Sequence, residues 1–393
     1  MDLECGGGDL SDCCNIIGEK EQKKSFMKFA LIPWTSEELQ DGIFIHKNAA
    51  GTWIPTESAA YLMQQEFFRL GHELHTYDCY PDWSEVDFFL LYSIDWIAAE
   101  RITRAGYAEK MVYCNAEPPT VCSLHTREGY EILKQIFPKI LTWNPDWTDN
   151  RQVFKRCIPY YYKFSSCEIP FQKRKLITGI SANKHSDYPE ELYTERERAY
   201  DYFEKNYPDQ FDFYGILWEG TAHPCYRGTV KDKAEVFHKY KFAICFENTR
   251  TKRDYITEKI WDCLNAQIVP IYAGAENIRD YIPENCFISF DRFDSYDALA
   301  KFLMQMSEEE YQKYLDAALQ LLHSDVIDRF SGEQYAHDIL AAVEQKNDFQ
   351  MTGYGRNFLA AKARKEQRAL RRIRIRMAVK RIMGRNKNNV ARG

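Results

Sequence analysis

The sequence has no long apolar run: none approaches the ~18 residues that mark a membrane-spanning helix, and no leader of charged, apolar and small residues opens the chain. Neither export nor a membrane span is therefore expected. Twelve cysteines are present, but they are scattered without a repeated spacing of metal ligands. No zinc site can be read from them, and we expect reduced thiols in a cytoplasmic protein.

Three kinds of sequence motif are also absent. The chain contains neither a Gly-x-Gly-x-x-Gly nor a Gly-x-x-x-x-Gly-Lys-Ser/Thr loop, and it has no internal repeat with a period of about 20 to 50 residues. The first two absences remove the main support for a dinucleotide-binding or a P-loop protein. The third leaves no sign of a repeat architecture.

What is present is a globular composition with an uneven charge. The 393 residues are 45% hydrophobic and 28% charged, and their formal net charge is −6. This length allows two domains of roughly 150 residues. The segment 351–393 holds 14 Lys or Arg and one acid, Glu366, so the preceding part is strongly acidic. The pattern indicates an acidic globule with a basic arm.

Short β-branched or aromatic runs alternate with helical patterns in two series. The first series predicts strands at 29–32, 74–77, 86–92, 110–114 and 140–142, with helices at 57–70, 97–105 and 127–137. The second predicts strands at 175–180, 211–214, 242–246 and 268–272, with helices at 195–206, 231–239 and 257–265. Such alternation is typical of βαβ units and parallel sheets.

Two Rossmann-like domains follow from this alternation. We predict an α/β fold with one domain at 25–160 and another at 171–348, joined by the turn-rich stretch 159–170. Residues 1–24 lack periodicity and are expected to form a disordered leader. Because parallel sheets bind ligands at the carboxyl ends of their strands, two such edges facing one another predict a deep cleft for a nucleotide-bearing ligand.

The most informative stretch follows the predicted strand 242–246, which ends in the polar residues 247–249. After a polar loop, a helix is expected to begin with Thr257 as its N-cap and with Glu258 and Lys259 in its first turn. A helix start offers unpaired amides and partial positive charge, which favour phosphate. The simple alternative is a capped surface helix whose first-turn charges are solvated.

The same stretch resembles the donor-site motif of the α1,3/4-fucosyltransferases, glycosyltransferase family 10, and it looks like a bacterial-type member. The matching pieces occur in order: Phe246-Glu247-Asn248, then Asp254-Tyr255-Ile256-Thr257-Glu258-Lys259, Val269-Pro270-Ile271-Tyr272 with Gly274, and Pro283 with Phe287-Ile288. A run of this length is specific, and the resemblance extends more thinly over about 26–345. It implies a GT-B-like fold in which two Rossmann-like domains face a cleft.

The resemblance also implies a pocket for GDP-fucose. Asn248 and Tyr255 would line it, Glu258 would accept hydrogen bonds from the ribose, and Lys259 would lie beside the pyrophosphate.

A second segment contributes to the same pocket. The strand running into Asn183 resembles the one before the family's nucleotide-binding arginine. Arg196, in the pattern Arg-x-x-x-Tyr with Tyr200, is similar to that arginine, and Arg198 is its rival.

In the first domain, a predicted strand runs into Asn115-Ala116-Glu117-Pro118-Pro119. This looks like the family's Glu-Ser-Pro segment, whose glutamate is taken as the catalytic base. Pro118 stands where the family has Ser, which keeps the glutamate but removes a hydroxyl. Without the resemblance, Glu117 reads as a turn residue before two prolines.

The implied reaction is transfer of L-fucose from GDP-β-L-fucose with inversion, giving an α1,3-fucoside on O3 of GlcNAc or Glc in an oligosaccharide or glycolipid. The chain contains no Asp-x-Asp triplet, so neither a metal ion nor another cofactor is expected. Acceptor contacts are expected around Trp34, Thr56-Glu57 and 92–96. The alternatives are another GDP-sugar or linkage, and a non-catalytic glycan-binding protein.

The basic arm, 351–393, is expected to be a helical, partly amphipathic tail, with Leu370, Ile373 and Met377 on one side. Such a segment suits an anionic membrane surface. A coiled coil, a nucleic-acid contact or a simply solvated tail are the alternatives, although we expect no nucleic-acid partner. The expected location is the cytoplasm, with peripheral contact to the inner face of the membrane.

Overall fold

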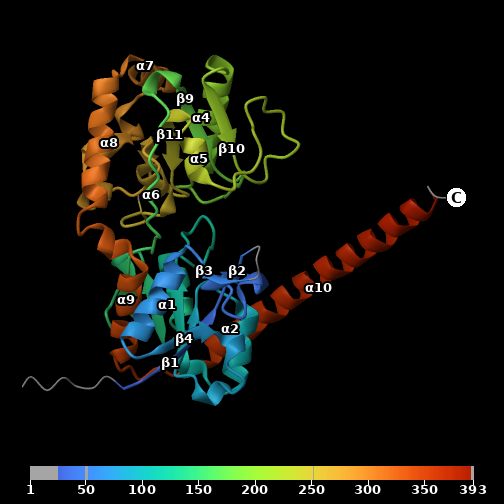
Figure 1. The fold of residues 1–393 in the computed structure, drawn as a ribbon. Coiled ribbons are helices and arrows are strands. Elements are labelled where there is room, and N and C mark those ends of the chain that lie inside the picture. The colour runs from blue at the N-terminus through green and yellow to red at the C-terminus, as the bar shows by residue number, and fades with distance from the viewer. Residues whose placement is uncertain (1–24, 49–51, 251, 391–393) are drawn as a thin grey trace, which may run out of the picture.

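The computed structural model describes residues 25–48, 52–250 and 252–390. It has two α/β lobes, one above the other in Figure 1, and a long C-terminal helix that projects from the lower lobe. The predicted leader, 1–24, lies outside the described residues. Within the described part of the chain, no helix is long and apolar enough to cross a membrane.

The first lobe contains a six-stranded parallel sheet with the order β4-β1-β5-β6-β7-β8. Its strands are β1 (Lys28–Ile32), β4 (Glu73–Thr76), β5 (Phe88–Leu91), β6 (Met111–Asn115), β7 (Lys139–Thr142) and β8 (Val153–Lys155). A separate antiparallel pair comprises β2 (Ile45–Lys47) and β3 (Trp53–Pro55). The central strands are buried along their length, as expected for a parallel sheet covered on both faces.

The helices of the first lobe begin where the sequence provides a cap. They are α1 (Ala59–Arg69), α2 (Trp96–Arg104) and α3 (Arg127–Leu133). The side chains of Ser58, Asp95 and Thr126 each accept a backbone hydrogen bond from the first turn of the helix that follows.

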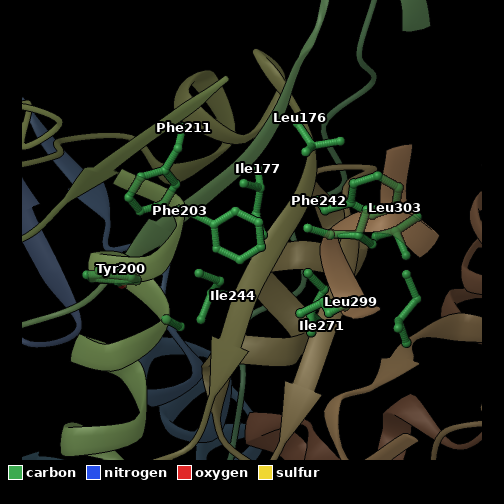
Figure 2. Close-up of a cluster of buried hydrophobic side chains, with 14 of the residues drawn as sticks. Leu176, Ile177, Tyr200, Phe203, Phe211, Phe242, Ile244, Ile271, Leu299 and Leu303 are labelled. Carbon is green, nitrogen blue, oxygen red and sulfur yellow. The ribbon is translucent and has the colours of Figure 1, made fainter. Parts of the chain in front are cut away.

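The second lobe contains a five-stranded parallel sheet with the order β10-β9-β11-β12-β13. Its strands are β9 (Lys175–Ile180), β10 (Phe211–Tyr214), β11 (Tyr240–Phe246), β12 (Val269–Ala273) and β13 (Ile288–Ser289). Its helices are α4 (Tyr193–Asn206), α5 (Lys233–Phe237), α6 (Glu258–Asn265), α7 (Tyr296–Gln305) and α8 (Glu308–Leu322). Figure 2 shows one of its cores, where Tyr200 and Phe203 of α4 and Leu299 and Leu303 of α7 pack on Ile244 and Ile271 of the sheet.

The chain then returns to the first lobe, which the sequence did not predict. Helix α9 (Gly332–Glu344) was assigned to the second domain, 171–348, but Tyr335 and Ile339 share a core with Phe29. Figure 1 shows α9 beside α1 in the lower lobe. A Cβ on Gly332 would lie 2.1 Å from the Ala59 carbonyl oxygen, so the glycine permits this close approach.

The basic segment also begins inside the first lobe. Helix α10 (Gly353–Val390) packs its first turns on α2, where Phe358 contacts Trp96 and Leu359 is fully buried. The predicted tail, 351–393, therefore starts as part of the globule, and the helix leaves the lobe only after Ala363, which is 1% exposed. The remainder extends away from the body, as Figure 1 shows.

Candidate active site

A cavity of about 530 Å³ opens between the two lobes. It is lined by residues that lie within two positions of the ends of four strands: Glu117 after β6, Ser181 after β9, Gly215 after β10 and Asn248 after β11. The carboxyl ends of both parallel sheets therefore meet at this cavity, as the sequence predicted for a ligand cleft.

Most of the predicted site residues meet in this cavity. Six of them line it: Glu117, Arg196, Asn248, Tyr255, Glu258 and Lys259. The seventh, Asn183, is half-buried and does not line it, although Ala182 and Lys184 on either side do. The prediction that the segment after β9 lines the cavity is therefore correct, but the lining residues are the neighbours of Asn183 rather than Asn183 itself.

Glu117 lies in the turn that follows strand β6, and the last residue of that strand, Asn115, fixes the turn. The Glu117 N–H donates to Asn115 Oδ1 at 2.9 Å, and Asn115 Nδ2 donates to the Tyr130 hydroxyl at 2.7 Å. Asn115 is fully buried, whereas the Glu117 side chain is open to the cavity. Loss of solvent around the Glu117 carboxylate disfavours its charged form and raises its pKa, although the charges of Lys184 and Lys259 act in the opposite direction. A raised pKa makes this carboxylate a better proton acceptor.

The predicted helix start is present across the cleft. Thr257 is the N-cap of α6, and its hydroxyl accepts the Lys259 backbone N–H at 3.4 Å. The Lys259 ammonium donates to the Glu247 carboxylate and to the Thr257 hydroxyl, both at 3.0 Å. Burial opposes its charge, but Glu247 and Glu258 outweigh burial and raise the pKa of Lys259 above its ordinary value. Lys259 is therefore a fixed cation.

Glu258 has the opposite character. Its side chain is half exposed and lies 3.6 Å from the Lys259 ammonium. Loss of solvent disfavours the charged form of Glu258, but the positive charges of Lys259 and Lys233 outweigh this effect and lower the pKa of Glu258 to about 2. It is an anionic acceptor at the mouth of the cavity, and hydroxyl groups are its natural partners.

The structure separates the two candidate arginines. Arg196 is buried on the inner face of α4, where its Nη2 donates to the carbonyl oxygens of Phe246 at 2.7 Å and Glu247 at 3.1 Å. The Arg198 side chain is 66% exposed and lies 3.7 Å from Glu195, outside the cavity. Only Arg196 can reach a ligand in the cleft.

Asn248 and Tyr255 connect the donor side of the cavity to the first lobe. Asn248 Nδ2 lies 3.4 Å from the Tyr255 hydroxyl, to which it donates. The Tyr255 ring is buried and contacts Trp143 of the first lobe, with 4.8 Å between ring centroids. This wall of the cavity is therefore shared by both lobes.

Sequence reasoning missed three charged residues of this site. Lys184 and Lys233 line the cavity, and the buried Glu247 carboxylate accepts a hydrogen bond from the Lys259 ammonium. Lys184 lies in an irregular loop and Lys233 in the first turn of α5, so no periodic pattern marks either residue. Glu247 was visible within Phe-Glu-Asn, but only its burial reveals its contact with Lys259.

A second cavity, of about 710 Å³, adjoins the first and shares Trp34, Pro159 and Lys233 with it. Its lining includes Thr56, Glu57 and Tyr92, which were predicted as acceptor contacts. The rest of the predicted segment 92–96 does not line it, and the Trp96 ring faces Phe358 of α10 instead.

Potential metal ligands gather elsewhere. In the ranges that the structure describes, one group of three such side chains is close enough to hold an ion, namely Asp201, Glu204 and His223. None of these lines the cavity between the lobes. His223 Nδ1 is already hydrogen-bonded to Glu204 at 2.8 Å.

The cavity joins a cationic helix start in one Rossmann-like lobe to a carboxylate in the other. Arg196, Lys259 and the N-terminal end of α6 place positive charge on one wall of the cavity. The sheet topology of the two lobes confirms the predicted GT-B-like fold.

Comparison with known families identifies the second lobe. Residues 171–324 match the model described as "Glycosyltransferase family 10 (fucosyltransferase) C-term". The chain thus carries a family 10 glycosyltransferase domain, and the resemblance seen in its motifs is confirmed.

Solved structures support the fold. A crystal structure of an α1,3-fucosyltransferase with GDP superposes with a TM-score of 0.52 at 15% identity, covering 84% of this chain and 94% of that one. Anabaena HepE in complex with UDP-glucose gives a TM-score of 0.50 at 10% identity, covering 80% and 99%.

Curated relatives match over shorter segments. The chain is 27% identical over 165 residues to a GDP-fucose protein O-fucosyltransferase 3 of Gallus gallus, which is 41% of this chain and 30% of the relative. It is 36% identical over 100 residues to a 3-galactosyl-N-acetylglucosaminide 4-alpha-L-fucosyltransferase of Homo sapiens, covering 24% and 26%. The matched segments thus span less than a third of either relative.

Proposed function

We propose that this protein transfers L-fucose from GDP-β-L-fucose to a hydroxyl group of an acceptor glycan. The observation that carries the proposal is the cavity in which Glu117 of one lobe faces Arg196, Glu258 and Lys259 of a family 10 domain. The names of both relatives describe fucosyl transfer, and one of them specifies GDP-fucose.

In the proposed mechanism, an acceptor oxygen attacks the anomeric carbon from the face opposite GDP. The new carbon–oxygen bond forms as the bond to the phosphate oxygen breaks, so the β-linked donor becomes an α-fucoside in one displacement. Glu117 accepts the proton of the attacking hydroxyl. GDP leaves with the electron pair of the broken bond, and its diphosphate gains negative charge.

Cationic groups of the second lobe stabilise that charge. Lys259 is held by two hydrogen bonds, Arg196 lies buried on the same side, and the start of α6 lines the cavity with Thr257, Glu258 and Lys259. Fixed donors of this type are effective because they need no reorganisation during the reaction. The proposed reaction therefore uses no metal ion and no other cofactor.

The second cavity is the proposed acceptor site. The Trp34 side chain is exposed at the point where the cavities join, and its ring contacts Tyr92 at 5.4 Å between centroids. Aromatic rings with one open face suit the apolar faces of sugars. We propose O3 of GlcNAc or Glc as the nucleophile and an α1,3 linkage as the product.

Two alternatives make different predictions. A protein O-fucosyltransferase would take a protein as its acceptor, as the name of the chicken relative states for that protein. A non-catalytic glycan-binding protein would bind glycan without turnover, and Lys259→Ala would not change that binding.

Donor and acceptor screening tests the proposal. GDP release is measured with GDP-fucose and with GDP-mannose in the presence of galactosyl-N-acetylglucosamine, a lipopolysaccharide panel and an unglycosylated protein panel. Linkage analysis of the product then identifies the bond. We expect turnover with GDP-fucose and a glycan, and a large loss in Lys259→Ala. Preference for GDP-mannose, or full activity of Lys259→Ala, would contradict the proposal.

We further propose that the projecting part of α10 contacts an anionic membrane from the cytoplasmic side. Among the side chains that the structure describes in this helix, up to residue 376, the exposed cations are Arg364, Lys365, Arg368, Arg371, Arg372, Arg374 and Arg376. Each charge near an anionic surface contributes about 1 kcal/mol. The protein should therefore sediment with vesicles that contain phosphatidylserine, and it should not sediment with neutral vesicles. Equal recovery with both kinds of vesicle would argue for a solvated tail.

A further inference from the structure

One residue at the end of β11 contacts both cations of the proposed donor site. The Glu247 carbonyl oxygen accepts a hydrogen bond from Arg196 Nη2 at 3.1 Å. The Glu247 carboxylate accepts one from Lys259 Nζ at 3.0 Å. Arg196 is 4% exposed and Glu247 is fully buried, so neither contact is a flexible surface pairing.

The Glu247 carboxylate also holds the start of α6. One oxygen accepts the Thr257 backbone N–H at 2.9 Å, and the other accepts the Thr257 hydroxyl at 2.7 Å together with the Lys259 ammonium. Gly274 packs behind it, because a Cβ at that position would lie 2.6 Å from Glu247 Cγ. Three hydrogen bonds and the packing of Gly274 therefore fix the carboxylate in place.

This arrangement is electrostatically unfavourable for simple diphosphate binding. A buried negative charge next to Lys259 weakens the attraction of that lysine for an anion, and a buried charge needs strong partners to be tolerated at all. Its benefit must lie in geometry. A lysine side chain is flexible, and three hydrogen bonds to one carboxylate fix where the ammonium and the helix start lie.

We propose that Glu247 is a positioning residue, which fixes the Lys259 ammonium and the first turn of α6 where charge develops on the departing diphosphate. This inference rests on the proposed function. Interactions that depend on exact placement affect the transition state more than the ground state, and a misplacement of about 1 Å costs roughly 100-fold in rate.

The test uses Glu247→Gln in the full-length chain. The glutamine retains the length and an oxygen for the Thr257 N–H, but its amide group cannot hold the Lys259 ammonium. We expect kcat with GDP-fucose to fall roughly 10- to 100-fold, while calorimetry shows GDP binding that is unchanged or tighter, because a repelling charge has been removed. A purely structural residue would not produce this split.

Asp212→Asn is the matched control. Asp212 is equally buried in the same lobe and is paired with Lys175 and Arg227, both at 2.6 Å, but it does not line the cavity. We expect a lower melting temperature with an unchanged kcat. If Glu247→Gln behaves in the same way, or if it loses GDP affinity in proportion to kcat, the positioning role is refuted.

Gly274→Ala decides the matter if Glu247→Gln does not fold. Its added methyl group would lie 2.6 Å from both Glu247 Cγ and the Tyr272 hydroxyl, so the Glu247 side chain must shift while its charge remains. We therefore expect kcat to fall while GDP affinity is retained. An unchanged kcat would refute the inference. Absence of fucosyl transfer by the wild-type chain would instead refute the proposed function, so the two failures are distinguishable.

Discussion

Glu117→Gln is the cleanest perturbation of the proposed chemistry. The substitution preserves the shape of the side chain and removes its ability to accept a proton. The turn that presents Glu117 uses only its backbone N–H, bonded to Asn115 Oδ1 at 2.9 Å. Because the side chain is open to the cavity, we expect the free energy of unfolding to change by no more than about 0.5 kcal/mol.

The expected effect on catalysis is large. A positioned general base contributes about 10²- to 10⁴-fold, which corresponds to roughly 3 to 5 kcal/mol of transition-state free energy. Partial loss of solvent around the Glu117 carboxylate raises its pKa and so brings it nearer to the working pH, which favours the upper part of that range. GDP affinity should stay constant, because the groups expected to contact GDP lie in the other lobe.

The pH dependence gives an independent check. A base must be deprotonated, so activity is present above the pKa of Glu117 and is lost as pH falls through it. Because the pKa of Glu117 is raised, the acid limb of kcat/KM should lie above the ~4.3 of an ordinary glutamate. Steady-state kinetics, GDP calorimetry and thermal melting are measured on the same preparation. A kcat within threefold of wild type, or an unchanged acid limb in the variant, would refute Glu117 as the base.

Three further predictions concern the surroundings of the site. Lys184→Met removes a charge that lowers the pKa of Glu117, so the acid limb of the pH–rate profile should move to higher pH, and a shift to lower pH would contradict this. Trp34→Ala should raise the acceptor KM by up to about tenfold, and by more than the GDP-fucose KM; equal changes would argue against stacking. Trp143→Ala should destabilise the fold by about 3 to 5 kcal/mol in a denaturant titration, because this buried ring packs on Tyr255; a loss under ~1 kcal/mol would contradict it.

The two sheets were predictable because most of their strands are apolar runs that can be recognised in the sequence. The predicted strands 175–180 and 211–214 coincide with β9 and β10, since each is an apolar run bounded by turn residues. Strand β8 was missed because its three residues are too short for a periodic pattern. The return of α9 to the first lobe was missed for another reason. The amphipathic pattern of a helix shows that one of its faces is buried, but it does not show which sheet covers that face.

The candidate site was predictable where residues lie within two positions of the end of a strand. Glu117 and Asn248 occupy such positions, and both line the cavity. Arg196 and Arg198 could not be separated with certainty by sequence, because they lie two residues apart on one helix. Their different directions on α4 leave one buried in the cleft and the other in solvent.

The contacts between the lobes explain why sequence motifs alone describe only part of this site. Asp254, in the loop before α6, has a backbone φ of 62° and is paired with Lys155 of the first lobe at 3.1 Å. Beside it, Tyr255 packs on Trp143 of that same lobe. The first lobe therefore supplies Glu117 and also supports the loop that leads into the start of α6, the proposed phosphate site. A change at these contacts moves the base and the cations relative to one another, so the distance between them is a property of the lobe interface rather than of either motif.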